Sequence, residues 1–230
     1  MRALITLLAA VTLAVGSASS SFGSIIDFTG GTVTLQGGGG TFTTNNDATY
    51  QDVDYYTEDG FKLDFIGNEA GPTFSSIVGT YYDGLHDIIH GHWATGGFGS
   101  LTEIRVTKLD AASFDVNYFV LTSNTDTGGG KASGNERAFI HASIDGVNIS
   151  YSQLLPPDDW GFAGANPQIF LGPQFDSVKW FSFTVEDRVD CFGMDDFYIN
   201  EPGPGVIPEP ATMALIGLGL LGLARNRRRK

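Results

Sequence analysis

Hydrophobic and polar residues alternate along most of the chain, and the alternation has a period of two. It is clearest in seven short stretches, residues 61–65, 101–106, 114–120, 139–144, 147–151, 181–185 and 197–199. Successive side chains of a β-strand point to opposite faces, so this period predicts strands with one buried face. Residues 24–205 contain no window with the period of a long amphipathic helix. The pattern therefore predicts many short antiparallel strands in this part of the chain.

Glycine-rich turns separate these stretches. The chain has 31 glycines, and the clusters at residues 37–40 and 128–130 mark loops. Asp145-Gly146 lies between two alternating stretches and predicts a two-residue hairpin. Because each sheet has one apolar face, two sheets must cover each other. We therefore expect an all-β fold, a β-sandwich of jelly-roll type, formed by residues 19–200 as one domain.

The N-terminal residues have the three parts of a secretory signal peptide. Arg2 precedes an apolar stretch, residues 3–15, which small residues follow. Gly16 and Ala18 suit the small-residue positions before a cleavage site. We expect residues 1–18 to be the signal peptide, with cleavage after Ala18 as the first choice and after Ser20 as the second.

The last 23 residues have a different order of features. A proline tag ends the folded body, an uncharged apolar run covers residues 211–224, and a basic cluster closes the chain. Fourteen helical residues span about 21 Å, which is shorter than the roughly 30 Å hydrocarbon core of a bilayer. The run therefore predicts a short transmembrane helix for transient insertion, with the basic cluster on the cytoplasmic side. The tag is Pro208, Glu209 and Pro210, and the cluster contains Arg225, Arg227, Arg228, Arg229 and Lys230.

This tail, residues 208–230, resembles the PEP-CTERM sorting signal of Gram-negative bacteria, in which the same three elements occur in the same order. The resemblance implies that an exosortase recognises the tag and removes the helix. It also implies transient association with the inner membrane, then a location at the cell surface or outside the cell. Proteins with this signal are associated as a family with exopolysaccharide and biofilm. Residues 201–207, rich in proline and glycine, are expected to link the sandwich to the tail.

The charge of the body is more negative than the whole-chain value of −13 indicates. The body holds 25 of the 26 acidic residues and seven of the 13 basic residues, so its net charge is near −18. This charge argues against nucleic acid and anionic lipid as partners. Cys191 is the only cysteine, so a disulfide within the chain is excluded. A buried, unreactive thiol is expected, and a disulfide between two molecules is the alternative.

A second resemblance concerns metal binding by the body. Residues 192–199 are similar to the last strand of galactose-binding-like jelly rolls. In those folds an aspartate near this strand often helps to hold a structural calcium ion, which implies that role for Asp195 or Asp196. Calcium takes six to eight oxygen ligands, and Asp27 or Asp47 could contribute if the N-terminus lies beside the last strand. The alternative is an aspartate that simply faces solvent.

Three histidines, His86, His90 and His92, lie within seven residues. On a strand, His90 and His92 point to the same side and offer two ligands for a transition metal, zinc or copper. Packing of these rings at a sheet edge is the alternative, and the sequence leaves the role of all three open.

Catalytic motifs are missing, so we expect no enzyme activity. Trp160 and Trp93 are candidate surfaces for stacking on sugar rings, and the alternative is that they are core residues. The predicted function is a structural or adhesive role at the surface or in the exopolysaccharide matrix, with exosortase and polysaccharide as partners. A lectin-like carbohydrate-binding module is the second hypothesis and a secreted hydrolase the third.

Overall fold

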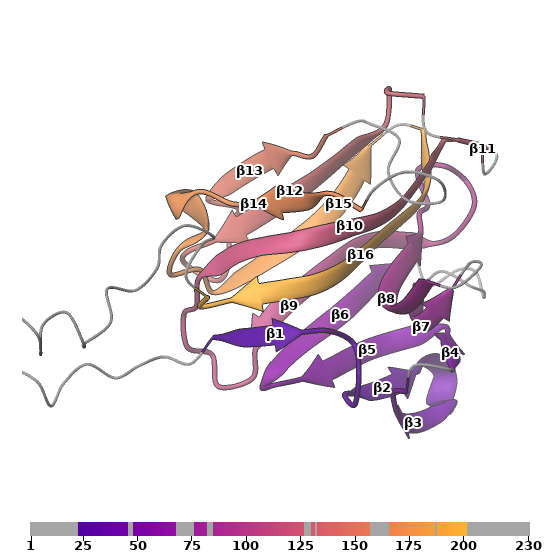
Figure 1. Cartoon of the computed structure of the whole chain (residues 1–230), viewed down its shortest axis with the longest axis horizontal. Coiled ribbons are helices and arrows are strands. Elements are labelled where there is room, and N and C mark those ends of the chain that lie inside the picture. Colours follow the sequence, from indigo (N-terminus) through magenta and orange to yellow (C-terminus); the bar gives the residue numbers. More distant parts are fainter. Residues whose placement is uncertain are drawn as a thin grey trace, which may run out of the picture.

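The computed structural model describes residues 23–45, 48–67, 76–81, 85–126, 130–131, 133–156, 166–186 and 188–201. This part of the chain is almost entirely β-structure, arranged in two sheets that face each other as a sandwich (Figure 1). The prediction of an all-β sandwich is confirmed, whereas the jelly-roll subtype stays a prediction. Within these residues no helix has the length and hydropathy needed to cross a membrane.

The first sheet, sheet A, is built around the last strand of the chain. Its strands lie in the order β11 (Gly130–Lys131), β10 (Val116–Asp126), β16 (Val189–Ile199), β8 (Leu85–His92), β7 (Ser76–Tyr81) and β4 (Thr49–Gln51). Two further strands extend it, because β1 (Ser24–Ile26) pairs with β16 and β14 (Gln168–Phe170) pairs with β10. The long β16 therefore lies between β10 and β8, near the middle of the sheet.

The second sheet, sheet B, covers the inner face of sheet A. Its strands are β13 (Tyr151–Leu154), β12 (Arg137–Ser143), β15 (Trp180–Glu186), β9 (Leu101–Lys108), β6 (Phe61–Gly67), β5 (Val53–Glu58), β2 (Thr32–Leu35) and β3 (Gly40–Thr43). Two single 3₁₀ turns, η1 (Gln36–Gly38) and η2 (Pro173–Phe175), interrupt the connections. Five of the seven predicted strand stretches fall largely within β6, β9, β10, β12 and β15, and residues 197–199 form the end of β16.

Aromatic side chains fill the space between the sheets. Phe183 of β15 is fully buried, and its ring lies 5.1 Å from that of Phe119 and 5.8 Å from that of Phe197, measured between centroids. Phe119 and Phe197 belong to sheet A, so these contacts join the two layers. Burial of rings at alternate positions is what the period of two requires.

The predicted hairpin at Asp145-Gly146 is wrong. β12 ends at Ser143 and β13 begins at Tyr151, so a seven-residue loop joins them. Asp145 closes this loop with its side chain, which accepts hydrogen bonds from the backbone N–H groups of Val147 and Asn148. Only Gly146 of the pair has a positive φ, whereas a two-residue type I′ turn needs positive φ at both positions.

A two-residue hairpin does form at the other Asp-Gly pair. Asp59 and Gly60 connect β5 to β6, with φ values of 47° and 81°. The flanking residues Glu58 and Phe61 are paired across the strands. Both central residues thus have the positive φ that this turn type requires.

Candidate functional site

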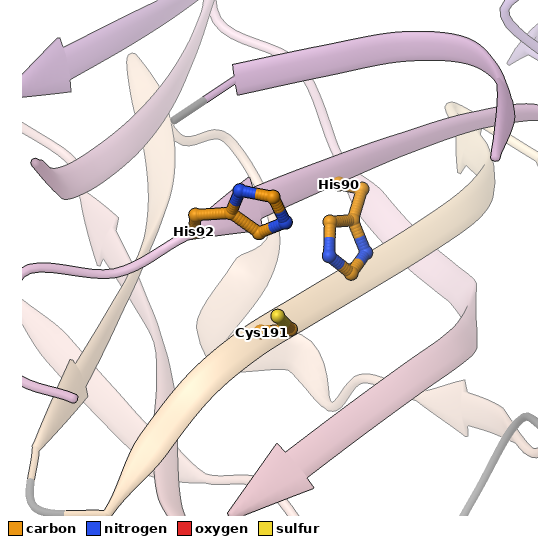
Figure 2. A group of neighbouring side chains, drawn as sticks. All are labelled: His90, His92 and Cys191. Atoms are coloured by element: carbon orange, nitrogen blue, oxygen red, sulfur yellow. The ribbon is translucent and has the colours of Figure 1, made fainter. Parts of the chain in front are cut away.

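Two histidines and the single cysteine converge on one side of sheet A. His90 and His92 come from β8, and Cys191 comes from the neighbouring β16. Cys191 is paired with His92 in the antiparallel register, and Gly193, which has no side chain, is paired with His90. Figure 2 shows both imidazoles and the thiol on the same side of the two strands, turned toward one another.

The donor atoms of these three residues are close and buried. One ring nitrogen of each histidine and the Cys191 sulfur all lie within 4.8 Å of one another. His90 is 0 %, His92 3 % and Cys191 2 % exposed. The neighbouring residues Ile89 and Phe192 belong to the core between the sheets, so the alternation places the cluster on the opposite face of sheet A.

The turn after β8 covers His92. The ring of Phe98 meets the imidazole of His92 edge to face at 4.6 Å between centroids, and Phe98 itself is half exposed. A side chain at Gly99 would overlap the backbone carbonyl of His92, so this glycine permits the close approach. Gly96 approaches the buried carboxylate of Asp190 in the same way. The turn therefore packs tightly against His92 at the end of β8 and against Asp190, the residue before Cys191 on β16.

Burial sets the protonation of His90. Desolvation, and after it the charge of His92, holds the pKa of His90 well below its ordinary value. His90 is therefore a neutral imidazole at neutral pH, with a lone pair on one ring nitrogen. A neutral imidazole is the form that binds a metal ion.

The sequence indicated only part of this arrangement. His90 and His92 point to the same side of one strand, as expected from their spacing. Cys191 was expected to be an isolated buried thiol, because nothing in the sequence indicates that β16 pairs with β8. The side chain of His86 lies outside the described residues.

A second feature is a row of apolar side chains on the face of sheet A that carries the cluster. Four residues on four neighbouring strands are paired in register: Ile25 with Tyr198, Tyr198 with Tyr118, and Tyr118 with Phe170. The rings of Tyr118 and Tyr198 are stacked at 3.8 Å with an interplanar angle of 15°. Ile25 is 41 % and Phe170 50 % exposed. We refer to these four residues, three of which are aromatic, as the aromatic row.

Carboxylates lie beside the aromatic row. Burial, followed by the charge of Asp27, raises the pKa of Asp196, and a hydrogen bond to Tyr198 opposes this shift. Burial and then the charge of Asp196 raise the pKa of Tyr198 to about 12. Tyr198 therefore stays protonated at neutral pH, next to carboxylates that can accept hydrogen bonds.

The predicted calcium ligands Asp27, Asp195 and Asp196 lie beside the aromatic row. Asp27 follows β1, which pairs with β16, so the N-terminal segment does lie beside the last strand. Asp195 and Asp196 are half-buried, and one Asp195 carboxylate oxygen accepts a hydrogen bond from the backbone N–H of Asp196. Among the described residues, His90, His92 and Cys191 are the group of three ligand side chains with metal-binding proximity. Calcium binding by Asp195 or Asp196 thus stays a prediction, and Asp47 lies outside the described residues.

Glu58 is a further carboxylate near Asp27. It accepts hydrogen bonds from the Tyr56 hydroxyl at 2.7 Å and from the Phe28 backbone N–H at 3.0 Å. Burial raises the pKa of Glu58 to about 7, and the charge of Asp27 acts in the same direction. The Glu58 carboxyl therefore changes charge close to neutral pH.

Trp93 requires a correction. It was a candidate for stacking on a sugar ring, but it is fully buried and packs against Phe192 at 6.1 Å between ring centroids. Its ring is part of the core because it follows β8 on the inner side of the sheet.

Other predicted positions lie outside the described residues: Trp160, the cleavage site at Ala18, and the sorting residues Pro208, Glu209, Pro210, Arg225, Arg227, Arg228 and Arg229.

Comparison with solved structures returns distant β-domains. A mutant lectin binding domain of Lectinolysin in complex with Lewis b is 10 % identical, covers 51 % of this chain and 73 % of its own, and has a TM-score of 0.31. A DUF4465 family protein from Bacteroides caccae is 10 % identical, with 79 % and 100 % coverage and a TM-score of 0.42. The K1 cleaved adhesin domain of Lys-gingipain from Porphyromonas gingivalis is 15 % identical, with 80 % and 100 % coverage and a TM-score of 0.35. These likenesses are too distant to carry a functional argument.

The tail gives a more specific match. None of the curated proteins compared with this chain matches it in sequence. Residues 206–229, however, match the PEP-CTERM protein-sorting motif, at the position where the proline tag, the apolar run and the basic cluster follow one another. This motif is the recognition signal of exosortase and indicates export. The chain therefore carries the PEP-CTERM sorting signal of exported Gram-negative proteins, which indicates a cell-surface or extracellular location.

Proposed function

We propose that the protein is a non-catalytic component of the exopolysaccharide or biofilm matrix, with a structural or adhesive role after processing by exosortase. The sorting motif at residues 206–229 carries this proposal, because it directs the chain to the place where such a matrix lies. The body suits that role, since a β-sandwich with a net charge near −18 is compact and resists nonspecific binding to anionic surfaces.

The expected processing can be measured on the protein from its own host. Intact mass spectrometry compares the wild-type strain with a strain that lacks the exosortase. We expect the residues after Pro208-Glu209-Pro210 to be removed in the wild type and retained in the mutant, and the processed protein to occur in the matrix fraction.

The control is a chain in which Glu209 is changed to alanine, which alters the tag and leaves the apolar run and basic cluster intact. It should keep its tail in the wild-type strain. A basic tail that persists in wild-type cells, or a processed protein that is absent from the matrix fraction, would contradict the proposal.

Carbohydrate binding is the second candidate, and the aromatic row favours it. Sugar rings stack on flat aromatic faces, and the stacked pair Tyr118–Tyr198 continues to Phe170 on the next strand. Asp27 and Asp196 beside the row could accept hydrogen bonds from sugar hydroxyls. An extended row across four strands suits a polysaccharide chain better than a single sugar.

Changing Tyr198 to alanine should weaken binding to the host's exopolysaccharide by about fivefold or more, because each lost stacking contact costs about 1 kcal/mol or more. Affinity co-sedimentation with the purified polysaccharide measures this effect. Phe42→Ala is the matched control, since Phe42 is 44 % exposed and packs on Tyr50 in a different part of the surface. Equal binding by both variants and the wild type would exclude the aromatic row as the binding surface and favour a structural role without specific carbohydrate binding.

A further inference from the structure

We infer that His90, His92 and Cys191 form a binding site for one transition-metal ion of the zinc or copper class. The inference does not depend on the matrix role proposed above. Two imidazole nitrogens and one thiolate are a donor set that Zn²⁺ and Cu⁺ favour, whereas Ca²⁺ and Mg²⁺ prefer oxygen ligands. The cluster is therefore chemically distinct from the carboxylates at Asp27 and Asp196.

The geometry needs little adjustment. Zinc bonds of about 2.0–2.1 Å to nitrogen and about 2.3 Å to sulfur place neighbouring ligand atoms roughly 3.3 to 3.6 Å apart in a tetrahedron. The donor atoms already lie within 4.8 Å of one another. Side-chain rotations that move each donor atom by about an ångström would bring these atoms to the distances of a zinc site, without movement of the strands.

The strands themselves hold the three residues in place. β8 and β16 are paired over Cys191–His92 and Gly193–His90, so the backbone positions of the ligands are fixed by the ladder of sheet A. Sites built on paired strands are more rigid than sites on loops. Three protein ligands leave a fourth tetrahedral position, which water fills in sites of this kind.

Burial gives the ion a role in stability. Removing two imidazoles and a thiol from water has a cost, and a metal ion offers a bond to all three donor atoms together. Phe98 packs on His92 and is itself half exposed, so this side of the cluster lies close to the protein surface.

The test uses the protein as its host exports it. The protein is purified with a reductant, freed of metal with a chelator, and titrated separately with Zn²⁺, Cu⁺ and Co²⁺, the last as an optical reporter. We expect one ion per chain, a higher Tm with Zn²⁺, and a thiolate-to-metal charge-transfer band with Co²⁺. A wild-type protein that binds none of them at one per chain would overturn the proposal.

Variants assign the ligands. Cys191→Ser should abolish the cobalt charge-transfer band and lower the affinity by more than the roughly 10- to 100-fold that loss of an outer-shell partner costs. His92→Gln should also lower the affinity and provides a second variant if Cys191→Ser does not fold, as judged by circular dichroism. An unchanged cobalt spectrum in folded Cys191→Ser would overturn the assignment.

The matched control is His141→Gln. His141 is also buried, but it lies on β12 of sheet B, and its two ring nitrogens bond the hydroxyls of Ser152 at 2.7 Å and Thr184 at 2.8 Å. This variant should bind all three ions as the wild type does. Equal loss of binding in His141→Gln and His92→Gln would show a general folding defect and contradict a local site.

Discussion

Replacing Phe183 with alanine is expected to destabilise the protein by about 3–5 kcal/mol, the usual cost of removing a large aromatic side chain from a core. Phe183 is fully buried, and its ring lies between 5.1 and 6.0 Å from the rings of Phe119, Phe192 and Phe197 of sheet A. The cavity would lie where the two sheets meet, so it removes contacts from both layers at once. The rigid strands around it cannot collapse into the space.

Urea unfolding followed by tryptophan fluorescence measures this change as a lower midpoint at unchanged slope. Thermal unfolding should show a Tm lower by roughly 6 to 20 °C, since 1 kcal/mol corresponds to about 2–4 °C in a domain of this size. Phe42→Ala is the control, because a ring that is 44 % exposed should cost about 1 kcal/mol or less. Equal effects of the two substitutions would contradict the assignment of Phe183 to the centre of the core.

Gly79→Ala is expected to destabilise the protein by about 2–4 kcal/mol, through backbone strain and a lost hydrogen bond. Gly79 on β7 has a φ of 106°, a conformation that residues with a side chain rarely adopt. A Cβ atom there would lie 2.1 Å from the carbonyl oxygen of Ala48. That oxygen accepts a hydrogen bond from the Thr80 backbone N–H at 3.0 Å, so moving it disturbs the pairing of β4 with β7.

Gly60→Ala separates strain from overlap. Gly60 has a φ of 81°, but a Cβ atom there would meet no atom within 4 Å. This substitution should therefore cost only about 1 kcal/mol, the penalty of the left-handed backbone alone. Thermal unfolding compares the two variants. A Gly79→Ala variant as stable as Gly60→Ala would show that the Ala48 segment moves aside freely and that β4 contributes little to sheet A.

The strands were predictable from sequence because burial of one face imposes a period of two. Phe181, Phe183 and Val185 occupy alternate positions on β15 and all three are buried, as a strand with one face toward the core requires. Turn type was less predictable, because Asp-Gly is compatible with more than one loop. Asp59-Gly60 forms the two-residue hairpin, whereas Asp145 uses its carboxylate to close a longer loop. The difference lies in side-chain hydrogen bonds that the dipeptide alone does not reveal.

The candidate site was predictable only within one strand. The spacing of His90 and His92 shows that they share a side, because that relation depends on consecutive residues. Their proximity to Cys191, and the register of Ile25, Tyr198 and the rest of the aromatic row, depend on which strands are neighbours. Strand order is a property of the whole fold, and residues about a hundred positions apart carry no local signal of it.

The pairing of β1 with β16 has a consequence for the order in which the sheet assembles. The first and last strands of the body are neighbours, and both ends of the sandwich lie on the same side of the molecule (Figure 1). β16, which separates β10 from β8, is also the last strand in chain order. Sheet A therefore cannot be completed before residue 199 is available to the fold. Until then β8 and β10 lack the strand that joins them, so β1 and β16, the two ends of the body, enter the sheet together.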